Sequence, residues 1–166
     1  MKIDLKTAQL IIVAGLFLLL YAGRLVKGVP KQTAEGLAFP LKPIVVWGRA
    51  LLFPLYIFFF ILPVWQTTHH LPMWLPLLVL GVAALLLWNM PGTIVLDATG
   101  LKQYFWLRKD KEIAYPQVMS VQKIGAGRMT RVLGNNNENI THTWNHSGAA
   151  EFAAEMERRT GKRVIL

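Results

Sequence analysis

The hydrophobic pattern of the chain changes near residue 91. Before this point apolar residues form three long blocks without a clear period, whereas after it apolar and polar residues alternate over short stretches. A block of about 20 apolar residues is long enough to span the hydrocarbon core of a bilayer, and short alternation is typical of half-buried strands. The pattern therefore predicts a three-helix transmembrane anchor over residues 1–90 and a small strand-rich domain over residues 91–166.

The three apolar blocks cover about residues 7–26, 44–65 and 71–90. The first has seventeen uncharged residues between Lys6 and Arg24; a cleaved signal peptide is its alternative interpretation, although no clear small-x-small cleavage site precedes a charge. Only the five residues QTTHH separate the second and third blocks, which predicts a tight antiparallel hairpin. Four tryptophans near the block ends fit the aromatic belts of a membrane interface: Trp47, Trp65, Trp74 and Trp88.

Composition and charge extend this prediction. Of the 166 residues, 54% are hydrophobic and only 16% are charged, which is typical of a membrane protein. Because basic residues favour the cytoplasmic side, their distribution predicts a multi-pass protein of the bacterial inner (cytoplasmic) membrane, with the N-terminus outside and the C-terminal domain cytoplasmic. The hairpin turn carries no Lys or Arg and the C-terminal domain eleven, while the first loop and its flanks carry five: Arg24, Lys27, Lys31, Lys42 and Arg49.

The region after Pro91-Gly92 predicts about six short antiparallel strands followed by one helix. The expected strands lie in TIVLD, LKQYFWL, EIAY, PQVMSVQKI, RMTRVLG and ITHTW, with turn residues between them. Ser147 is the expected N-cap of the helix, and Gly161 is its expected end. Strands that do not alternate with helices argue against a parallel α/β sheet.

This region resembles the bacterial pleckstrin-homology-like domains. The similarity lies in the stretch TIVLDATGLKQYFWLRKDKEIAYPQVMSVQKI, in the run Ile113, Tyr115, Val118 and Val121, and in a C-terminal helix with Phe152 as its packing aromatic. The resemblance implies an antiparallel sheet or barrel with a C-terminal capping helix, attached to transmembrane helices, and a binding or assembly role without known chemistry. Phosphoinositide-binding relatives carry clustered basic residues in the first hairpin, whereas here only Lys102 stands beside Asp97.

The residues that could carry chemistry form no convincing site. The chain has no cysteine, and the adjacent His69 and His70 in the expected turn have no nearby carboxylate, so polar turn residues are favoured over a metal site. His142 and His146 are four apart, but the residues between them do not read as helix. The sequence GAGR at residues 125–128 lacks the Lys-Ser/Thr of a phosphate loop and favours a strand connection. We therefore expect no cofactor, no metal and no enzyme.

Arg49 is the only charged residue well inside an expected span. Two interpretations stay open: its side chain reaches a lipid phosphate at the boundary, or it contacts a partner subunit or a bound ligand. No carboxylate within the expected spans is available to pair with it.

The function that these patterns favour is a non-catalytic accessory or assembly subunit of a larger integral membrane complex, which docks through its helices and its pleckstrin-homology-like domain. The alternative is a module that binds anionic lipid at the inner leaflet; a small membrane enzyme would need turnover that depends on His69, His70 or Arg49. The expected partners are other integral membrane subunits and anionic phospholipid, not nucleic acid. The residues expected to contact partner or lipid are Arg24, Lys27, Lys31, Arg49, Tyr104, Trp106, Arg108, Lys109, Lys111, Arg128 and Arg131.

Overall fold

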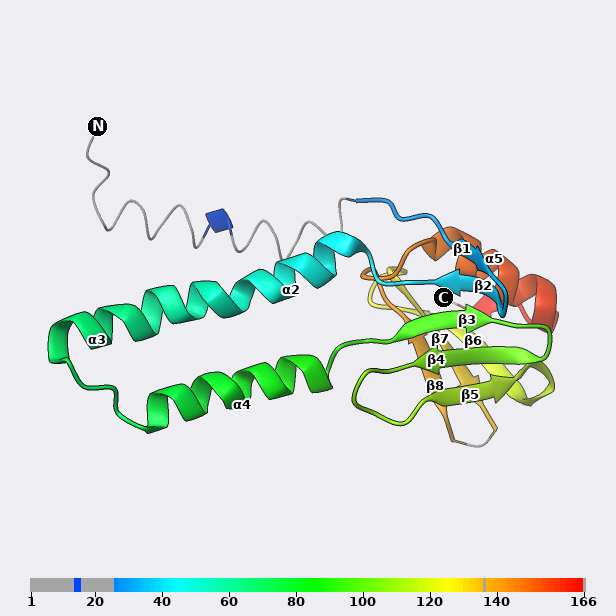
Figure 1. The fold of residues 1–166 in the computed structure, drawn as a ribbon. Coiled ribbons are helices and arrows are strands. Elements are labelled where there is room, and N and C mark those ends of the chain that lie inside the picture. Colours follow the sequence, from blue (N-terminus) through cyan, green and yellow to red (C-terminus); the bar gives the residue numbers. More distant parts are fainter. Residues whose placement is uncertain (1–13, 16–25, 136, 166) are drawn as a thin grey trace. The chain divides into compact units, whose positions relative to one another are not determined.

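The structure, a computed structural model, describes residues 14–15, 26–135 and 137–165 (Figure 1). The chain divides into two units, each of which is described separately. The helical unit comprises residues 1–25 and 43–90, and the sheet unit comprises residues 26–42 and 91–166. The helical hairpin is thus inserted into the sequence of the sheet unit.

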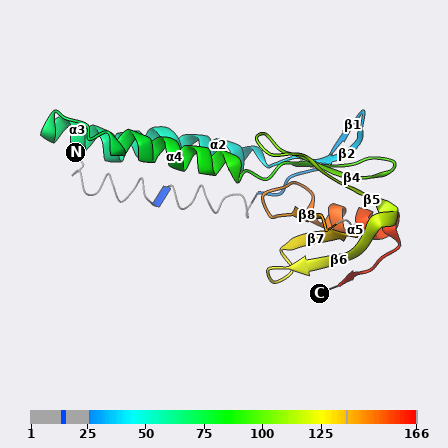
Figure 2. The ribbon, with the colours of Figure 1, turned by 90° about the horizontal axis from the view of Figure 1, so that it is seen from below.

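The described helices of the helical unit form an antiparallel hairpin. Its first arm contains α2 (Pro43–Tyr56), a π-helical segment η1 (Ile57–Ile61) and α3 (Leu62–Thr68), and its second arm is α4 (Trp74–Trp88). The two arms run side by side in both views (Figures 1 and 2). The π-helical segment lies between Pro54 and Pro63, whose missing N–H groups interrupt the regular hydrogen-bond ladder.

The predicted transmembrane anchor is wrong. In the part of the chain that the structure describes, no helix combines the length and the apolar character that crossing a membrane requires. The expected span 44–65 is divided by the π-helical segment, and α2 and α4, with 14 and 15 residues, are about 21 and 22 Å long, shorter than a hydrocarbon core of about 30 Å. The expected span 7–26 lies almost entirely outside the described residues.

Two further expectations depended on that anchor and are corrected with it. A multi-pass location in the bacterial inner membrane, with the C-terminal domain in the cytoplasm, was predicted from hydropathy and basic residues, and the described helices contradict it. The description of the chain as a membrane protein with transmembrane helices is overturned by the same finding. Hydropathy measures how apolar a block is, and it does not register where proline and turn residues divide the helix.

The first sheet of the sheet unit has five antiparallel strands in sequence order. They are β1 (Lys31–Thr33), β2 (Gly36–Phe39), β3 (Thr93–Leu96), β4 (Gly100–Tyr104) and β5 (Lys111–Ala114). Sequence reasoning missed β1 and β2, because it treated this region as a basic loop. Phe39 pairs with Ile94, so the strands on either side of the hairpin insertion are neighbours in the sheet.

The second sheet has the order β8-β7-β6-β9, and the helix α5 lies next to it (Figure 2). After the 3-10 turn η2 (Tyr115–Gln117), its elements are β6 (Val118–Ile124), β7 (Met129–Gly134), β8 (Asn139–His142), α5 (Ala149–Thr160) and β9 (Val164–Ile165). The strands expected between residues 93 and 142 and the C-terminal helix are confirmed, except that the expected strand LKQYFWL ends at Tyr104 and its last three residues lie in a loop. The expected single antiparallel sheet or barrel is wrong, since there are two sheets and β9 runs parallel to β6.

The core lies between the two sheets and α5. Both sheets and the helix contribute fully buried side chains, and burial of each large apolar side chain stabilises the fold by about 1.5–3 kcal/mol. The buried cluster consists of Phe39, Ile94, Leu96, Leu101, Ile113, Val118, Val121, Val132, Ile140, Phe152 and Met156.

The ends of α5 differ partly from the prediction. The N-cap is Gly148, which has a positive φ of 62°, and not Ser147. Ser147 is buried, and its hydroxyl has no hydrogen-bond partner among the described residues. At the other end Gly161 adopts the left-handed conformation and its N–H bonds Glu157 O, so this predicted helix end is confirmed.

Candidate functional site

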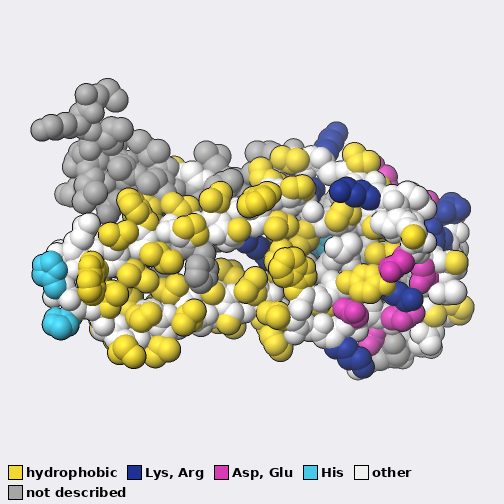
Figure 3. Space-filling model, viewed as in Figure 1, with side chains coloured by type: hydrophobic (Ala, Val, Ile, Leu, Met, Phe, Trp, Pro, Cys, Tyr) yellow, Lys and Arg dark blue, Asp and Glu magenta, His cyan; other side chains and the backbone are white. Residues whose placement is uncertain are grey.

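The most unusual surface of the molecule is the apolar face of the helical hairpin. Large side chains on all three helices are exposed, including Trp47 at 69% and Leu80 at 61% (Figure 3). Monomeric proteins rarely expose large continuous apolar patches unless the patch binds something. We call this the hairpin surface and define it by the exposed residues Trp47, Leu51, Phe58, Leu62, Trp65, Trp74, Leu77, Leu78, Leu80, Leu85 and Trp88.

Arg49 is the only Lys, Arg, Asp or Glu between Pro43 and Met90. Its side chain is half-buried, and among the described residues no carboxylate lies within ion-pair distance of it. Burial lowers the pKa of its guanidinium, which still stays charged at neutral pH because an arginine loses its proton only under strongly basic conditions. The structure therefore places one cation on an otherwise uncharged apolar hairpin.

The turn of the hairpin contains His69 and His70, and both are exposed. His69 has a positive φ of 54° and donates its N–H to Trp65 O at 2.9 Å, which makes it the C-cap of α3. Within the described residues no group of three or more His, Cys, Asp or Glu side chains could hold a metal ion. The arrangement explains His69 as a helix-ending residue.

A second exposed surface is the loop between β4 and β5. Trp106 and Leu107 at its tip are 76% and 54% exposed, and Arg108 and Lys109 follow them in the chain and are also exposed. We call residues 105–110 the β4–β5 loop. It brings together Trp106, Arg108 and Lys109 from the expected contact residues, whereas Lys111 donates to Asn139 O at 2.9 Å and belongs to β5.

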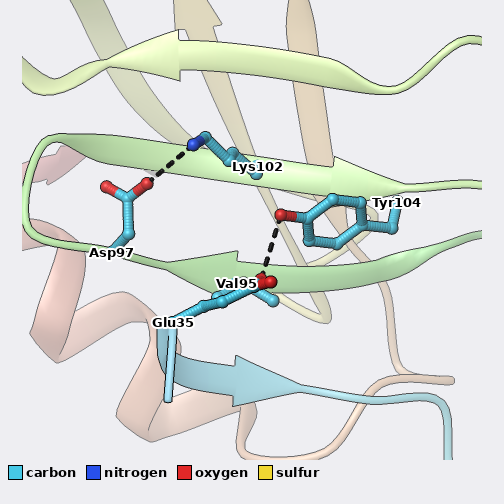
Figure 4. A pocket seen from close by; sticks show the side chains of 5 residues that line it. All are labelled: Glu35, Val95, Asp97, Lys102 and Tyr104. Atoms are coloured by element: carbon cyan, nitrogen blue, oxygen red, sulfur yellow. Dashed lines mark hydrogen bonds and ion pairs between the residues drawn. The ribbon is translucent and has the colours of Figure 1, made fainter. Parts of the chain in front are cut away.

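The outer side of the first sheet has a shallow pocket of about 290 Å³, lined by Glu35, Val95, Asp97, Lys102 and Tyr104 (Figure 4). The Lys102 ammonium lies 3.1 Å from Asp97 and 3.4 Å from Glu112, and the Tyr104 hydroxyl donates to Glu35 at 3.0 Å. Every polar side chain that lines the pocket is thus engaged within it or at its rim. This arrangement ties β4 to the β1–β2 turn.

Hydrogen bonding fixes the protonation state of this pocket. Burial alone would raise the pKa of Asp97, but the N–H groups of Thr99 and Gly100, the Thr99 hydroxyl and Lys102 lower it to about 2. The hydrogen bond to Glu35 raises the pKa of the Tyr104 hydroxyl. Asp97 is therefore a carboxylate and Tyr104 a phenol at neutral pH. A general acid or base needs a pKa near the working pH, which neither group has.

Two histidines are buried at one end of the sheet unit. His142 Nε2 donates to Ser147 O at 2.8 Å, and His146 Nε2 donates to Gly92 O at 2.8 Å while its Nδ1 accepts the Thr143 N–H at 3.0 Å. Burial, followed by the neighbouring His146, lowers the pKa of His142 to about 3, and burial also lowers the pKa of His146. Both rings are neutral and serve the fold; sequence reasoning found their spacing but not this role.

The remaining expected contact residues are scattered. Lys27 is exposed in the segment before β1, Lys31 is exposed at the start of β1, and Tyr104 points into the pocket beside Glu35 (Figure 4). Arg128 and Arg131 are exposed in the β6–β7 turn and on β7. Arg24 lies outside the described residues. Glu35 and Asp110, which organise the pocket and the β4–β5 loop, were missed, and nothing in their sequence spacing signals those contacts.

The turn at residues 125–128 has consecutive positive φ values at Gly125, Ala126 and Gly127, and it connects β6 to β7. The prediction of a strand connection for this glycine-rich stretch is therefore confirmed.

Comparison of the chain with protein-family models, with curated proteins and with solved structures finds no match. The resemblance to pleckstrin-homology-like domains thus stays a prediction.

Proposed function

We propose that the protein is a non-catalytic accessory subunit that binds a larger complex of integral membrane subunits through the hairpin surface. The observation that carries this proposal is the exposure of large apolar side chains along α2, α3 and α4, with Arg49 as the only charge between Pro43 and Met90. Each leucine or tryptophan buried at an interface contributes about 1.5–3 kcal/mol before the costs of association.

Apolar helices are the occupant that fits the hairpin surface best. A partner helix without charges leaves no side-chain polar group unpaired when it packs against leucine and tryptophan, whereas a polar partner would leave groups without hydrogen bonds. Helices of integral membrane subunits have such surfaces. On α4, a side-chain carbon added at Gly81 would meet no atom within 4 Å, so a partner helix could approach the backbone closely at this point.

Arg49 supplies the specificity of this contact. A guanidinium that becomes enclosed between apolar helices costs several kcal/mol unless an anionic group meets it. We therefore expect a carboxylate on the partner opposite Arg49. Its conservative replacement Arg49→Lys keeps the charge but loses the planar fork, so it should weaken binding less than Arg49→Leu weakens it.

The sheet unit offers a second contact surface. All three residues of β1 are exposed, and within the described part of the chain β1 is the edge strand of the first sheet and pairs with β2 alone. An edge strand presents unpaired N–H and C=O groups to which an extended segment of a partner can add. The two contacts use different chemistry, since β1 would bind a backbone and the hairpin surface would bind side chains.

Purification of the full chain in mild detergent from the cells that produce it tests the proposal. The expected result is co-migration with integral membrane chains in fixed stoichiometry. Leu77 and Leu80 are 63% and 61% exposed, so the double variant Leu77→Glu/Leu80→Glu should keep its fold and lose the partners. Met119→Glu, at an equally exposed apolar position of β6, is the matched control and should keep them.

A lone monomer in the mild-detergent extract, or equal partner recovery for the double variant and for wild type, would contradict the proposed function. Replacement of His69 and His70 distinguishes the proposed docking role from an enzymatic role of the hairpin turn. Because a docking subunit does not use the exposed turn for chemistry, His69→Gln/His70→Gln should leave partner recovery unchanged.

A further inference from the structure

The β4–β5 loop has an apolar tip, and a hydrogen bond joins its two ends. Between the end of β4 at Tyr104 and the start of β5 at Lys111, the Phe105 N–H donates to the Asp110 carboxylate at 2.9 Å, which closes the loop. The Arg108 guanidinium lies 4.9 Å from the centroid of the Phe105 ring. These two contacts hold the chain so that Trp106 and Leu107 project from it.

The charges around this tip are mostly positive. Arg108 and Lys109 are exposed, while the carboxylate of Asp110 is engaged by the Phe105 N–H. An indole and an aliphatic side chain therefore stand beside cations.

This combination fits the boundary between lipid headgroups and acyl chains. Tryptophan concentrates at that boundary because its ring is apolar and its N–H is polar, and leucine gains from contact with acyl chains. Each nearby Lys or Arg adds about 1 kcal/mol of attraction to an anionic surface. A nucleic acid would leave Leu107 without an apolar environment, so the loop favours a bilayer over a polyanion.

We propose that the β4–β5 loop inserts Trp106 and Leu107 into the surface of an anionic lipid bilayer, with Arg108 and Lys109 on the headgroup phosphates. The contact is peripheral and concerns the loop alone. It stands independently of the role proposed for the hairpin surface, because none of its residues belongs to the helical unit.

The absence of cysteine from the sequence allows a selective test on the full chain. A nitroxide attached at Leu107→Cys reports whether this position enters lipid, through its collision rates with oxygen and with a nickel chelate in the buffer. The same nitroxide at Ala154→Cys, an exposed site on α5, is the control. The probes are vesicles of phosphatidylcholine, vesicles of phosphatidylcholine with phosphatidylglycerol, and inorganic phosphate.

The expected result is a loss of nickel collisions at position 107 with the phosphatidylglycerol vesicles only, reversed by high salt, and no change at position 154. Arg108→Gln/Lys109→Gln should weaken this contact by up to about 30-fold, since each charge accounts for about fivefold. The matched control Arg158→Gln/Arg163→Gln removes the same charge from exposed positions elsewhere in the unit and should have little effect.

Two results would overturn the proposal. The first is unchanged collision rates at position 107 while the chain sediments with the phosphatidylglycerol vesicles. The second is an equal change with phosphatidylcholine alone or with inorganic phosphate. Neither result bears on the co-migration of partner chains, so the loop proposal and the proposed function fail separately.

Discussion

At the scale of single residues, His142 and His146 connect segments that are far apart in the sequence. His146 donates to Gly92 O, and its backbone forms a bridge with Leu41, while the His142 ring stacks on Phe152 with centroids 4.6 Å apart. A neutral histidine ring carries a proton on only one nitrogen, so it can donate a hydrogen bond inside the core without bringing a charge there. Adding a second proton would place a charge in the core, where it costs several kcal/mol.

This predicts a loss of stability in mild acid. The pKa of His142 is about 3 in the folded chain and 6.5 when exposed, so between these pH values the unfolded chain binds more protons. The free energy of unfolding should therefore fall as pH drops below about 6.5, by about 2 kcal/mol at pH 5 from this group alone. Urea denaturation at pH 7.5 and pH 5 measures it.

The variant His142→Gln keeps a donor for Ser147 O and cannot take up the proton, so its stability should depend less on pH. The exposed pair His69→Gln/His70→Gln is the control and should retain the wild-type pH dependence. An unchanged pH dependence in His142→Gln would argue against this role for the ring.

At the scale of elements, Arg159 links α5 to the end of the first sheet by hydrogen bonds, in addition to the packing of Phe152 and Met156 in the core. Arg159 donates to Asp97 O and to the Tyr115 hydroxyl, the latter at 2.9 Å, and its Nε donates to Glu155 at 3.0 Å. The neighbouring Arg158 contacts the same Glu155 but is 68% exposed and reaches no strand. Two adjacent arginines therefore differ in what they hold together.

This contrast predicts unequal effects of two similar substitutions. Arg159→Met removes the donor to the Tyr115 hydroxyl and one of the two donors to Asp97 O, which keeps the Tyr115 hydroxyl at 3.0 Å, and it should lower the free energy of unfolding by about 1–3 kcal/mol. Arg158→Met removes an exposed ion pair and should cost less than about 1 kcal/mol. Urea denaturation of both variants provides the comparison, and equal effects would contradict the attachment of α5 through Arg159.

The elements also show what the sequence could reveal. The strands between residues 93 and 142 were predictable because alternation and turn residues mark them locally. By contrast, β1 is three residues long and wholly exposed, so it has no hydrophobic pattern, and the contact between Tyr104 and Glu35 joins residues 69 positions apart. The transmembrane prediction failed because it overestimated the length of the helices. The apolar blocks contain prolines and turn residues that shorten them.

At the scale of the whole molecule, the helical hairpin is an insertion into a discontinuous sheet unit. The two points where the chain leaves and re-enters that unit both adjoin His146, since Leu41 pairs with its backbone and Gly92 accepts its side-chain N–H. The core cluster consists of residues from the two sheets and α5. The sheet unit therefore has what it needs to fold without the insertion.

This predicts that a short glycine-rich linker can replace residues 43–90. The shortened chain should keep the circular dichroism of its strands and unfold in one cooperative urea transition. Gly92→Ala in that chain is an informative control, because its Cβ would lie 1.5 Å from Tyr104 O and should abolish the fold. A shortened chain that is unfolded at neutral pH would contradict the autonomy of the sheet unit.

The pairing of Phe39 with Ile94 has a mechanical consequence. Because β2 ends where the hairpin leaves and β3 starts where it returns, tension on the hairpin draws both strands in one direction along their axes. Their neighbours β1 and β4 oppose that movement through several hydrogen bonds that must break together rather than one after another. A pull on the hairpin is therefore met by shear across the first sheet, the direction in which paired strands resist separation most strongly.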